Sequence, residues 1–114
     1  MKYMLQVRFN GADAAIGRLP ADEQEKVTAE FEAIRRSPGV LDGNQLQAAS
    51  EAATVRVKDG QLQVTARPAV EAGSELDGYY VYEAPGLDAA ISFAAGIPVA
   101  RLGGTIEVRP MLER

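Results

Sequence analysis

The side chains that could do chemistry in this chain are carboxylates, arginines and tyrosines, because its 114 residues include no histidine and no cysteine. Nucleophilic triads usually need a histidine as general base, and zinc and iron sites normally draw on histidine or cysteine. The Gly103-Gly104 pair lacks the spacing of a phosphate-binding loop. We therefore expect no metal site and no bound cofactor, and the missing catalytic motifs favour a non-catalytic protein over an enzyme.

A pair of glutamates, Glu71 and Glu75, is the only plausible acid–base equipment. Both fall in a predicted loop, where solvated carboxylates are the usual outcome and a perturbed pKa would require burial. Structural or solvent-facing roles are therefore favoured for this pair over catalysis.

Three arginines, Arg8, Arg56 and Arg109, could each bind a carboxylate or phosphate through paired hydrogen bonds. The alternative is that they pair with Glu83 and Glu107 or simply face water, since exposed ion pairs are common and weak. The ordinary surface role is favoured, and a small anionic ligand is the functional alternative.

Charge and composition argue against nucleic-acid-binding, membrane-spanning and secreted proteins. The net charge of −4 argues against a nucleic-acid partner, which usually requires a basic surface. No apolar run approaches the roughly 20 residues that span a bilayer, and the first residues lack the long apolar region of a signal peptide. We expect a cytoplasmic protein without a membrane partner, folded as a single domain over residues 1–114.

The elements that must position these side chains follow from the spacing of apolar residues. Alternation and helical spacing predict six strands and two helices: strands at Lys2–Phe9, Val40–Leu46, Thr54–Lys58, Gln61–Thr65, Gly78–Glu83 and Thr105–Arg109, and helices at Pro20–Arg36 and Leu87–Ile97. Asn10-Gly11-Ala12-Asp13 is predicted to break the chain after the first strand, Asp42-Gly43-Asn44 to interrupt the second strand, and Pro98 to end the second helix.

The cleanest local signal is Asp59-Gly60 between two alternating segments, which predicts a hairpin with a type I′ turn. The order is then β-α-β, a hairpin and β-α-β. This order predicts an α+β fold, a ferredoxin-like split βαβ sandwich with an inserted hairpin and both helices on one sheet face.

Alternation also assigns side chains to the two faces of the predicted sheet. The face toward the helices is predicted to hold Tyr3, Leu5, Val7, Val55, Val57, Leu62, Val64, Ile106 and Val108. The opposite face is predicted to hold Met4, Gln6, Arg8, Arg56, Gln63, Thr105, Glu107 and Arg109. An open sheet face can be left to water, or two such faces can pack in a homodimer that closes a barrel-like interior. Because this face includes Met4 and is not wholly charged, we expect the homodimer.

A pocket in such an interior would have Arg8, Arg56, Tyr79 and Arg109 near it, with Glu71 on a loop over its mouth. We expect a non-catalytic homodimeric domain that binds a small ligand or a regulatory partner. The first alternative is a cofactor-independent enzyme that acts on a small organic substrate through tyrosine, arginine and carboxylate groups. The second is a protein-interaction module.

Six segments, taken together and in order, carry a family resemblance: Met1-Lys2-Tyr3-Met4-Leu5, Thr54-Val55-Arg56-Val57-Lys58-Asp59-Gly60, Gly78-Tyr79-Tyr80, Leu87-Asp88-Ala89-Ala90, Ile97-Pro98 and Gly103-Gly104-Thr105-Ile106-Glu107-Val108-Arg109-Pro110. They resemble the YCII-related family, most closely its DGPF-domain branch. The resemblance implies a ferredoxin-like protomer in a dimeric α+β barrel. It also implies a regulatory context, because some relatives are associated with sigma factors.

The chain departs from the branch at its signature loop. Where the branch has Asp-Gly-Pro-Phe-Ala-Glu, this chain reads Ala66-Arg67-Pro68-Ala69-Val70-Glu71, and only Pro68 and Glu71 correspond. A His-Asp pair proposed for smaller relatives cannot be carried over, because the chain has no histidine.

Overall fold

The computed structural model describes residues 1–9, 12–70 and 75–113 of the chain. The elements in chain order are β1 (Lys2–Arg8), α1 (Ala12–Gly17), α2 (Ala21–Arg35), β2 (Val40–Gln45), the 3₁₀ turn η1 (Ala49–Glu51), β3 (Thr54–Lys58), β4 (Gln61–Thr65), β5 (Leu76–Glu83), α3 (Leu87–Ala95), α4 (Pro98–Arg101) and β6 (Thr105–Pro110). No helix among the described residues is long and apolar enough to cross a membrane.

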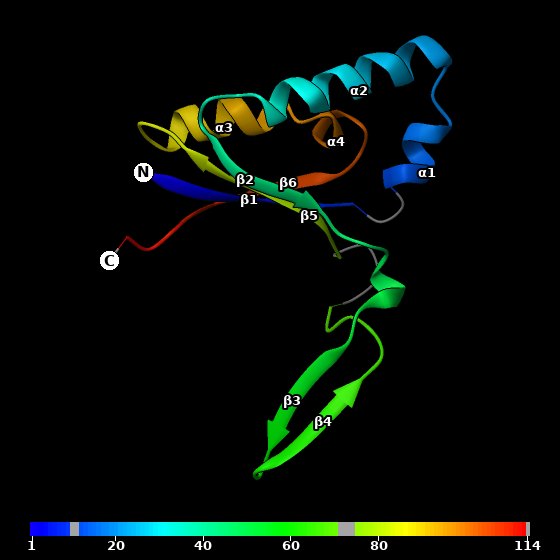
Figure 1. The fold of residues 1–114 in the computed structure, drawn as a ribbon, viewed down its shortest axis with the longest axis vertical. Helices are drawn as coiled ribbons and strands as arrows, with labels where there is room; N and C mark the ends of the chain where they lie inside the picture. Colours follow the sequence, from blue (N-terminus) through cyan, green and yellow to red (C-terminus); the bar gives the residue numbers. More distant parts are fainter. Residues whose placement is uncertain (10–11, 71–74, 114) are drawn as a thin grey trace.

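The main sheet has four strands in the order β2-β5-β1-β6, and every neighbouring pair is antiparallel. The helices lie on one face of this sheet and leave the other face open (Figure 1). With the hairpin set aside, the order of the four strands is that of a ferredoxin-like fold. The predicted fold class is therefore confirmed.

The core forms where the central strand β1 meets the helix layer. Tyr3, Leu5 and Val7 alternate along β1 and are 1%, 0% and 5% exposed. They pack with Ile34 of α2 and Ala90 of α3, among other buried residues. Each buried aliphatic side chain contributes about 1.5–3 kcal/mol to folding, so β1 anchors the sheet to the helices.

The helices carry the buried stripes that their sequences predict. In α2, Val27 and Ile34 are buried and Phe31 packs against the core. In α3, Ala90 and Ala94 are buried, and the ring of Phe93 stacks on Tyr82 of β5 at 4.0 Å between centroids. These contacts hold the two long helices side by side over the sheet.

Short helical segments were the main error of the predicted element list. The chain is helical again at α1, from Ala12, where a break was predicted, because alanine has a high helix propensity that the turn signal concealed. Pro98 does not simply end the second helix. That helix ends at Ala95, and Pro98 begins α4, whose first turn tolerates the missing N–H.

Strand β2 continues through Asp42-Gly43-Asn44, where an interruption was predicted, and its pairing with β5 shifts register only between Val40 and Asp42. Gly43 pairs with Tyr80 of β5, and a Cβ atom added to Gly43 would lie 2.5 Å from the Tyr80 ring. The aromatic ring fills the space beside Gly43. The glycine that was predicted to interrupt the strand is therefore needed for packing in the sheet.

The largest correction concerns the hairpin. Strands β3 and β4 pair in register around a turn where Asp59 and Gly60 both have positive φ, as predicted. However, they form a separate two-stranded sheet that projects from the body (Figure 1). The predicted core residues Val55, Val57, Leu62 and Val64 are 60%, 70%, 67% and 60% exposed, so their placement against the helices was wrong. Alternation predicts a strand but does not say which sheet the strand joins.

Shortening one buried side chain of the central strand β1 tests this account of the core. We expect Leu5→Ala to lower the free energy of unfolding by about 2–5 kcal/mol, because it leaves a cavity in a fully buried site. Urea denaturation followed by circular dichroism measures this change. The control is Leu112→Ala, at a position 81% exposed, which should change stability by less than about 0.5 kcal/mol. Equal losses from the two variants would contradict the assignment.

Candidate ligand-binding pocket

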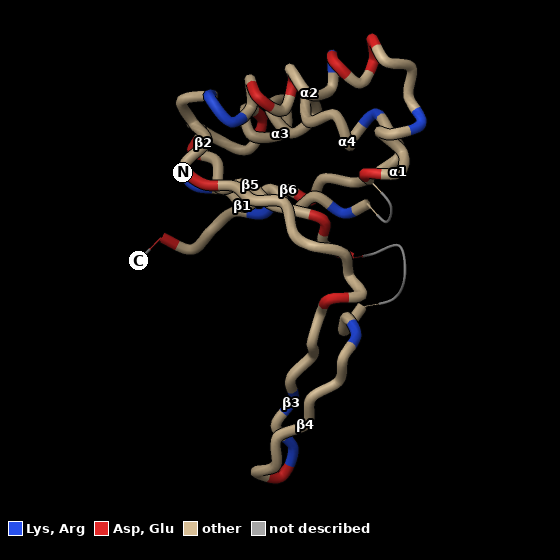
Figure 2. Tube along the Cα trace, turned by 45° about the vertical axis from the view of Figure 1, so that its right-hand side comes forward, with Lys and Arg blue, Asp and Glu red and all other residues tan. Residues whose placement is uncertain are grey.

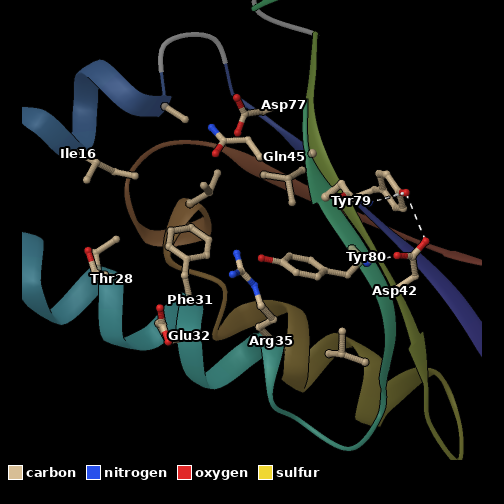
Figure 3. Close-up of a pocket in the computed structure, with 18 of the residues that line it drawn as sticks. Ile16, Thr28, Phe31, Glu32, Arg35, Asp42, Gln45, Asp77, Tyr79 and Tyr80 are labelled. Carbon is tan, nitrogen blue, oxygen red and sulfur yellow. Dashed lines mark hydrogen bonds between the residues drawn. The ribbon is translucent and has the colours of Figure 1, made fainter. Parts of the chain in front are cut away.

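A cavity of about 510 Å³ lies between the helices α1 and α2 and the neighbouring strands β2 and β5. It is on the helix-covered side of the sheet, and Figure 3 shows its lining side chains. Apolar side chains from every layer form much of its wall, namely Val7, Ile16, Val27, Phe31, Val40 and Val99. Its size and mixed lining are those of a small-molecule site.

Tyr80 and Arg35 form one polar side of the cavity. Tyr80 is paired with Leu5 and Gly43 across the sheet, which directs its ring to the helix side. Figure 3 shows its hydroxyl extending into the cavity beside the guanidinium of Arg35. Burial raises the pKa of Tyr80, and the positive charge of Arg35 partly opposes this rise. The phenol therefore stays protonated and can donate a hydrogen bond.

Two carboxylates, Asp77 and Asp13, form a second polar side, together with Gln45. The Gln45 side chain donates a hydrogen bond of 3.1 Å to Asp13. Burial raises the pKa of Asp77, and the negative charge of Asp13 raises it further. Asp77 is therefore easier to protonate than an ordinary aspartate.

The orientation of Asp77 depends on an irregularity in β5. Val7 of β1 pairs with Gly78, but Arg8 pairs with Leu76, so Asp77 is an extra residue in the strand. Strict alternation from Tyr79 would place Asp77 on the open face of the sheet. The bulge turns it instead into the lining of the cavity (Figure 3). Bulges often re-aim a side chain in this way beside functional sites.

Three of these polar side chains have no partner within the described part of the chain. Among the described residues, no side-chain hydrogen bond or ion pair is formed by the Arg35 guanidinium, the Tyr80 hydroxyl or the Asp77 carboxyl. All three line one cavity (Figure 3). Tyr80 and Asp77 are partly buried and Arg35 is exposed, so all three polar ends can be reached by a ligand.

Of the predicted site residues that the structure describes, only Tyr79 lines this cavity. Arg8, Tyr79 and Arg109 belong to the open sheet face, where Arg8 donates a 2.8 Å hydrogen bond to Gln6. Tyr79 contributes to the cavity lining, but its ring points away from the cavity (Figure 3). Its hydroxyl donates to Asp42 at 3.4 Å and accepts from the Asn44 amide at 3.2 Å.

Arg56 does not join these residues, because it lies on the projecting strand β3 and not in the main sheet. Its predicted place on the open face was wrong for the same reason as that of the hairpin valines. Glu71 lies outside the described residues, so its predicted position over the mouth of a pocket stays a prediction. No group of three or more carboxylates among the described residues is placed to hold a metal ion.

Sequence reasoning missed Arg35, Tyr80 and Asp77 as candidates. Tyr80 carried a usable signal, because alternation from Tyr82 places both on the core face, where a phenol usually needs a hydrogen-bond partner. Arg35 was explained by its favourable position at the end of α2. Asp77 carried no signal, since only the bulge brings it into the cavity.

Comparison with known proteins gives a family and a shared fold. The family model of the YCII-related domain matches residues 1–113. Among solved structures, the fold is similar to that of 5-chloro-2-hydroxyhydroquinone dehydrochlorinase from Burkholderia phenoliruptrix AC1100, in complex with 2,5-dihydroxybenzoquinone. The TM-score is 0.51 at 14% sequence identity, over 100% of this chain and 96% of that chain. No curated protein matched the chain.

The position of Asp77 predicts a specific dependence of stability on pH. Because its pKa is raised in the folded protein, the ionised form opposes folding above that pKa, and this penalty vanishes below the ordinary value of 3.8. We expect Asp77→Asn to raise the melting temperature at pH 7, and the gain to shrink steadily as the pH falls toward 3.8.

Thermal unfolding of both proteins across this pH range measures the difference. Glu107→Gln, on the open sheet face, removes the same charge outside the cavity and should show no such trend. A loss of stability at pH 7 in the Asp77→Asn variant would contradict the assigned environment.

Proposed function

This chain belongs to the YCII-related family, and we propose that it binds a small organic molecule in the cavity between α1, α2, β2 and β5. One observation carries the proposal: Arg35, Tyr80 and Asp77, which have no side-chain partner among the described residues, line one cavity of about 510 Å³. A protein that used this space only for packing would fill it with apolar groups or pair its polar ones.

The chemistry of the lining defines the class of ligand. The planar guanidinium of Arg35 can donate two parallel hydrogen bonds to a carboxylate or a similar acidic oxygen. The phenol of Tyr80 can donate a third to the same group. The carboxyl of Asp77 suits a hydroxyl at the other end, and the apolar wall between them suits a flat ring. We infer an aromatic or quinonoid compound with an acidic oxygen and a hydroxyl group.

Binding of two probes tests this inference. The probes are 4-hydroxybenzoate and 2,5-dihydroxybenzoquinone, and isothermal titration calorimetry measures their affinity. We expect Arg35→Gln and Tyr80→Phe each to weaken binding by about tenfold or more, because a hydrogen bond to a charged group is worth about 1.5–3 kcal/mol.

The matched control is Arg36→Gln. This neighbouring arginine is exposed at the C-cap of α2 and pairs with Glu32 at 2.9 Å, and it does not line the cavity. Its removal should leave probe affinity within a factor of two. Equal effects of the Arg35 and Arg36 variants, or no binding by the wild-type protein, would contradict the proposal.

A second candidate function is acid–base catalysis in the same cavity, without a cofactor. The observation that favours it is the raised pKa of Asp77, which brings a carboxyl group closer to the pH at which it can exchange protons. The dehydrochlorinase with a similar fold makes an enzyme plausible, although a shared fold does not fix the reaction. In this reading Asp77 removes a proton from carbon, and Tyr80 and Arg35 stabilise the oxyanion that forms.

Deuterium exchange separates catalysis from binding. With 4-hydroxyphenylpyruvate as probe in D₂O, nuclear magnetic resonance follows the replacement of the hydrogens beside its carbonyl group. If Asp77 is a general base, Asp77→Asn should slow the protein-dependent exchange about 100-fold or more while probe affinity changes little. Exchange at the rate of buffer alone would overturn catalysis on this probe and leave ligand binding as the function.

A further inference from the structure

The lining of the cavity is unevenly charged. Among the described residues that line it, the charged side chains are four carboxylates and one guanidinium, namely Asp13, Glu32, Arg35, Asp42 and Asp77. Two of the carboxylates are already engaged. Glu32 pairs with Arg36 at 2.9 Å, and Asp42 accepts a hydrogen bond of 2.9 Å from the backbone N–H of the next residue. Among the described residues, no ion pair is formed by Asp13 or Asp77.

The positive and negative charges lie on different sides of the cavity. Arg35 lies beside the hydroxyl of Tyr80, whereas Asp77 lies on another side next to Gln45 (Figure 3). The backbone fixes this second arrangement, because the N–H of Leu46 donates a 2.8 Å hydrogen bond to the carbonyl of Asp77. A ligand that places an acidic oxygen beside Arg35 therefore extends its other end toward the carboxylates.

Gln45 adds a third hydrogen-bond acceptor to the two carboxylates. Its amide nitrogen donates to Asp13 at 3.1 Å, so its amide oxygen remains to accept a hydrogen bond. Three acceptors, two of them charged, thus belong to one side of the cavity. A protonated amine has three N–H donors and one positive charge, so it matches these acceptors in number and in sign. A hydroxyl group offers one donor and leaves the negative charges unbalanced.

The two carboxylates also disfavour each other's charge. Burial raises the pKa of Asp77, and the negative charge of Asp13 raises it further, so both causes oppose the ionised form of Asp77. A positive charge between the two groups would offset both causes, because opposite charges at short distance stabilise each other. Gln45 cannot do so, since its amide is neutral. The acidic lining is therefore complementary to a cationic group of a ligand (Figure 2 shows the charged positions of the whole chain).

We propose that the ligand of this cavity also carries a protonated amine, which Asp13, Asp77 and Gln45 bind. The ligand is then a zwitterion, with an acidic group beside Arg35 and an ammonium group beside the carboxylates. This inference rests on the proposed binding function and adds one charged group to the class of ligand given there. Asp13 and Gln45 are exposed, so the ammonium group can enter on this side.

Two probes that differ in one group test for the amine. Both are 4-hydroxybenzoate extended beside its hydroxyl group: one carries an aminomethyl group, which is protonated at neutral pH, and the other a neutral hydroxymethyl group of similar size. Isothermal titration calorimetry measures the affinity of each. We expect the aminomethyl probe to bind about tenfold or more tightly than the hydroxymethyl probe, because hydrogen bonds between charged groups are the stronger ones.

A charge-removing variant tests the role of Asp13. Asp13→Asn should reduce the preference for the aminomethyl probe about threefold or more and leave the affinity for the hydroxymethyl probe within about twofold. The matched control is Asp88→Asn, because Asp88 also lies in the first turn of a helix, α3, but does not line the cavity. This control should leave the preference unchanged. Circular dichroism checks that both variants are folded.

The outcomes separate this inference from the proposed function. Equal affinities for the two probes, with 4-hydroxybenzoate still bound, would overturn the amine and leave the proposed function standing. An equal loss of affinity for both probes in Asp13→Asn, or the same loss of preference in Asp88→Asn, would also overturn it. If none of the three compounds binds to the wild-type protein, the proposed function and this inference fail together.

Discussion

The burial of one side of β1 is the constraint on which the rest of the structure depends. Tyr3, Leu5 and Val7 lie against the helix layer and are almost fully withdrawn from water. β1 is also the strand that pairs with both β5 and β6. A shift of one residue in either pairing would turn these three side chains to the open face. The hydrophobic burial of β1 therefore fixes the register of its neighbours and the face that the helices cover.

One polar side of the cavity depends on an interruption of this register. The regular pairing of β1 with β5 places Tyr80 and Tyr82 on the helix side. Near the end of β1 the bulge adds Asp77 and turns it to the same side. Tyr82 completes the core by stacking on Phe93, whereas Tyr80 extends past Gly43 into open space beside Arg35. One strand thus supplies both a packing tyrosine and a tyrosine available to a ligand.

The two faces of the sheet differ in character. The helix side places the polar groups of Arg35, Tyr80 and Asp77 around a cavity at the edge of a well-packed core, as a binding site for a small molecule requires. The open side combines partly buried apolar residues with charged ones. The cavity therefore lies on the side of the sheet where the helices pack, away from the open face.

The sequence by itself determined the six strands, the two longer helices and the fold class, since these follow from local periodicity and from the order of strands and helices. The alternation in β1, the apolar stripe of α2 and the Asp59-Gly60 turn each predicted what the structure contains. Only the tertiary structure decided which sheet each strand joined. Val55 and Leu62 alternate as well as Leu5 does, yet they lie on a separate hairpin, because alternation carries no information on the pairing partner. The site also depended on strand pairing. Asp77 reaches the cavity through a bulge, and a bulge arises from the pairing of two strands that are distant in sequence.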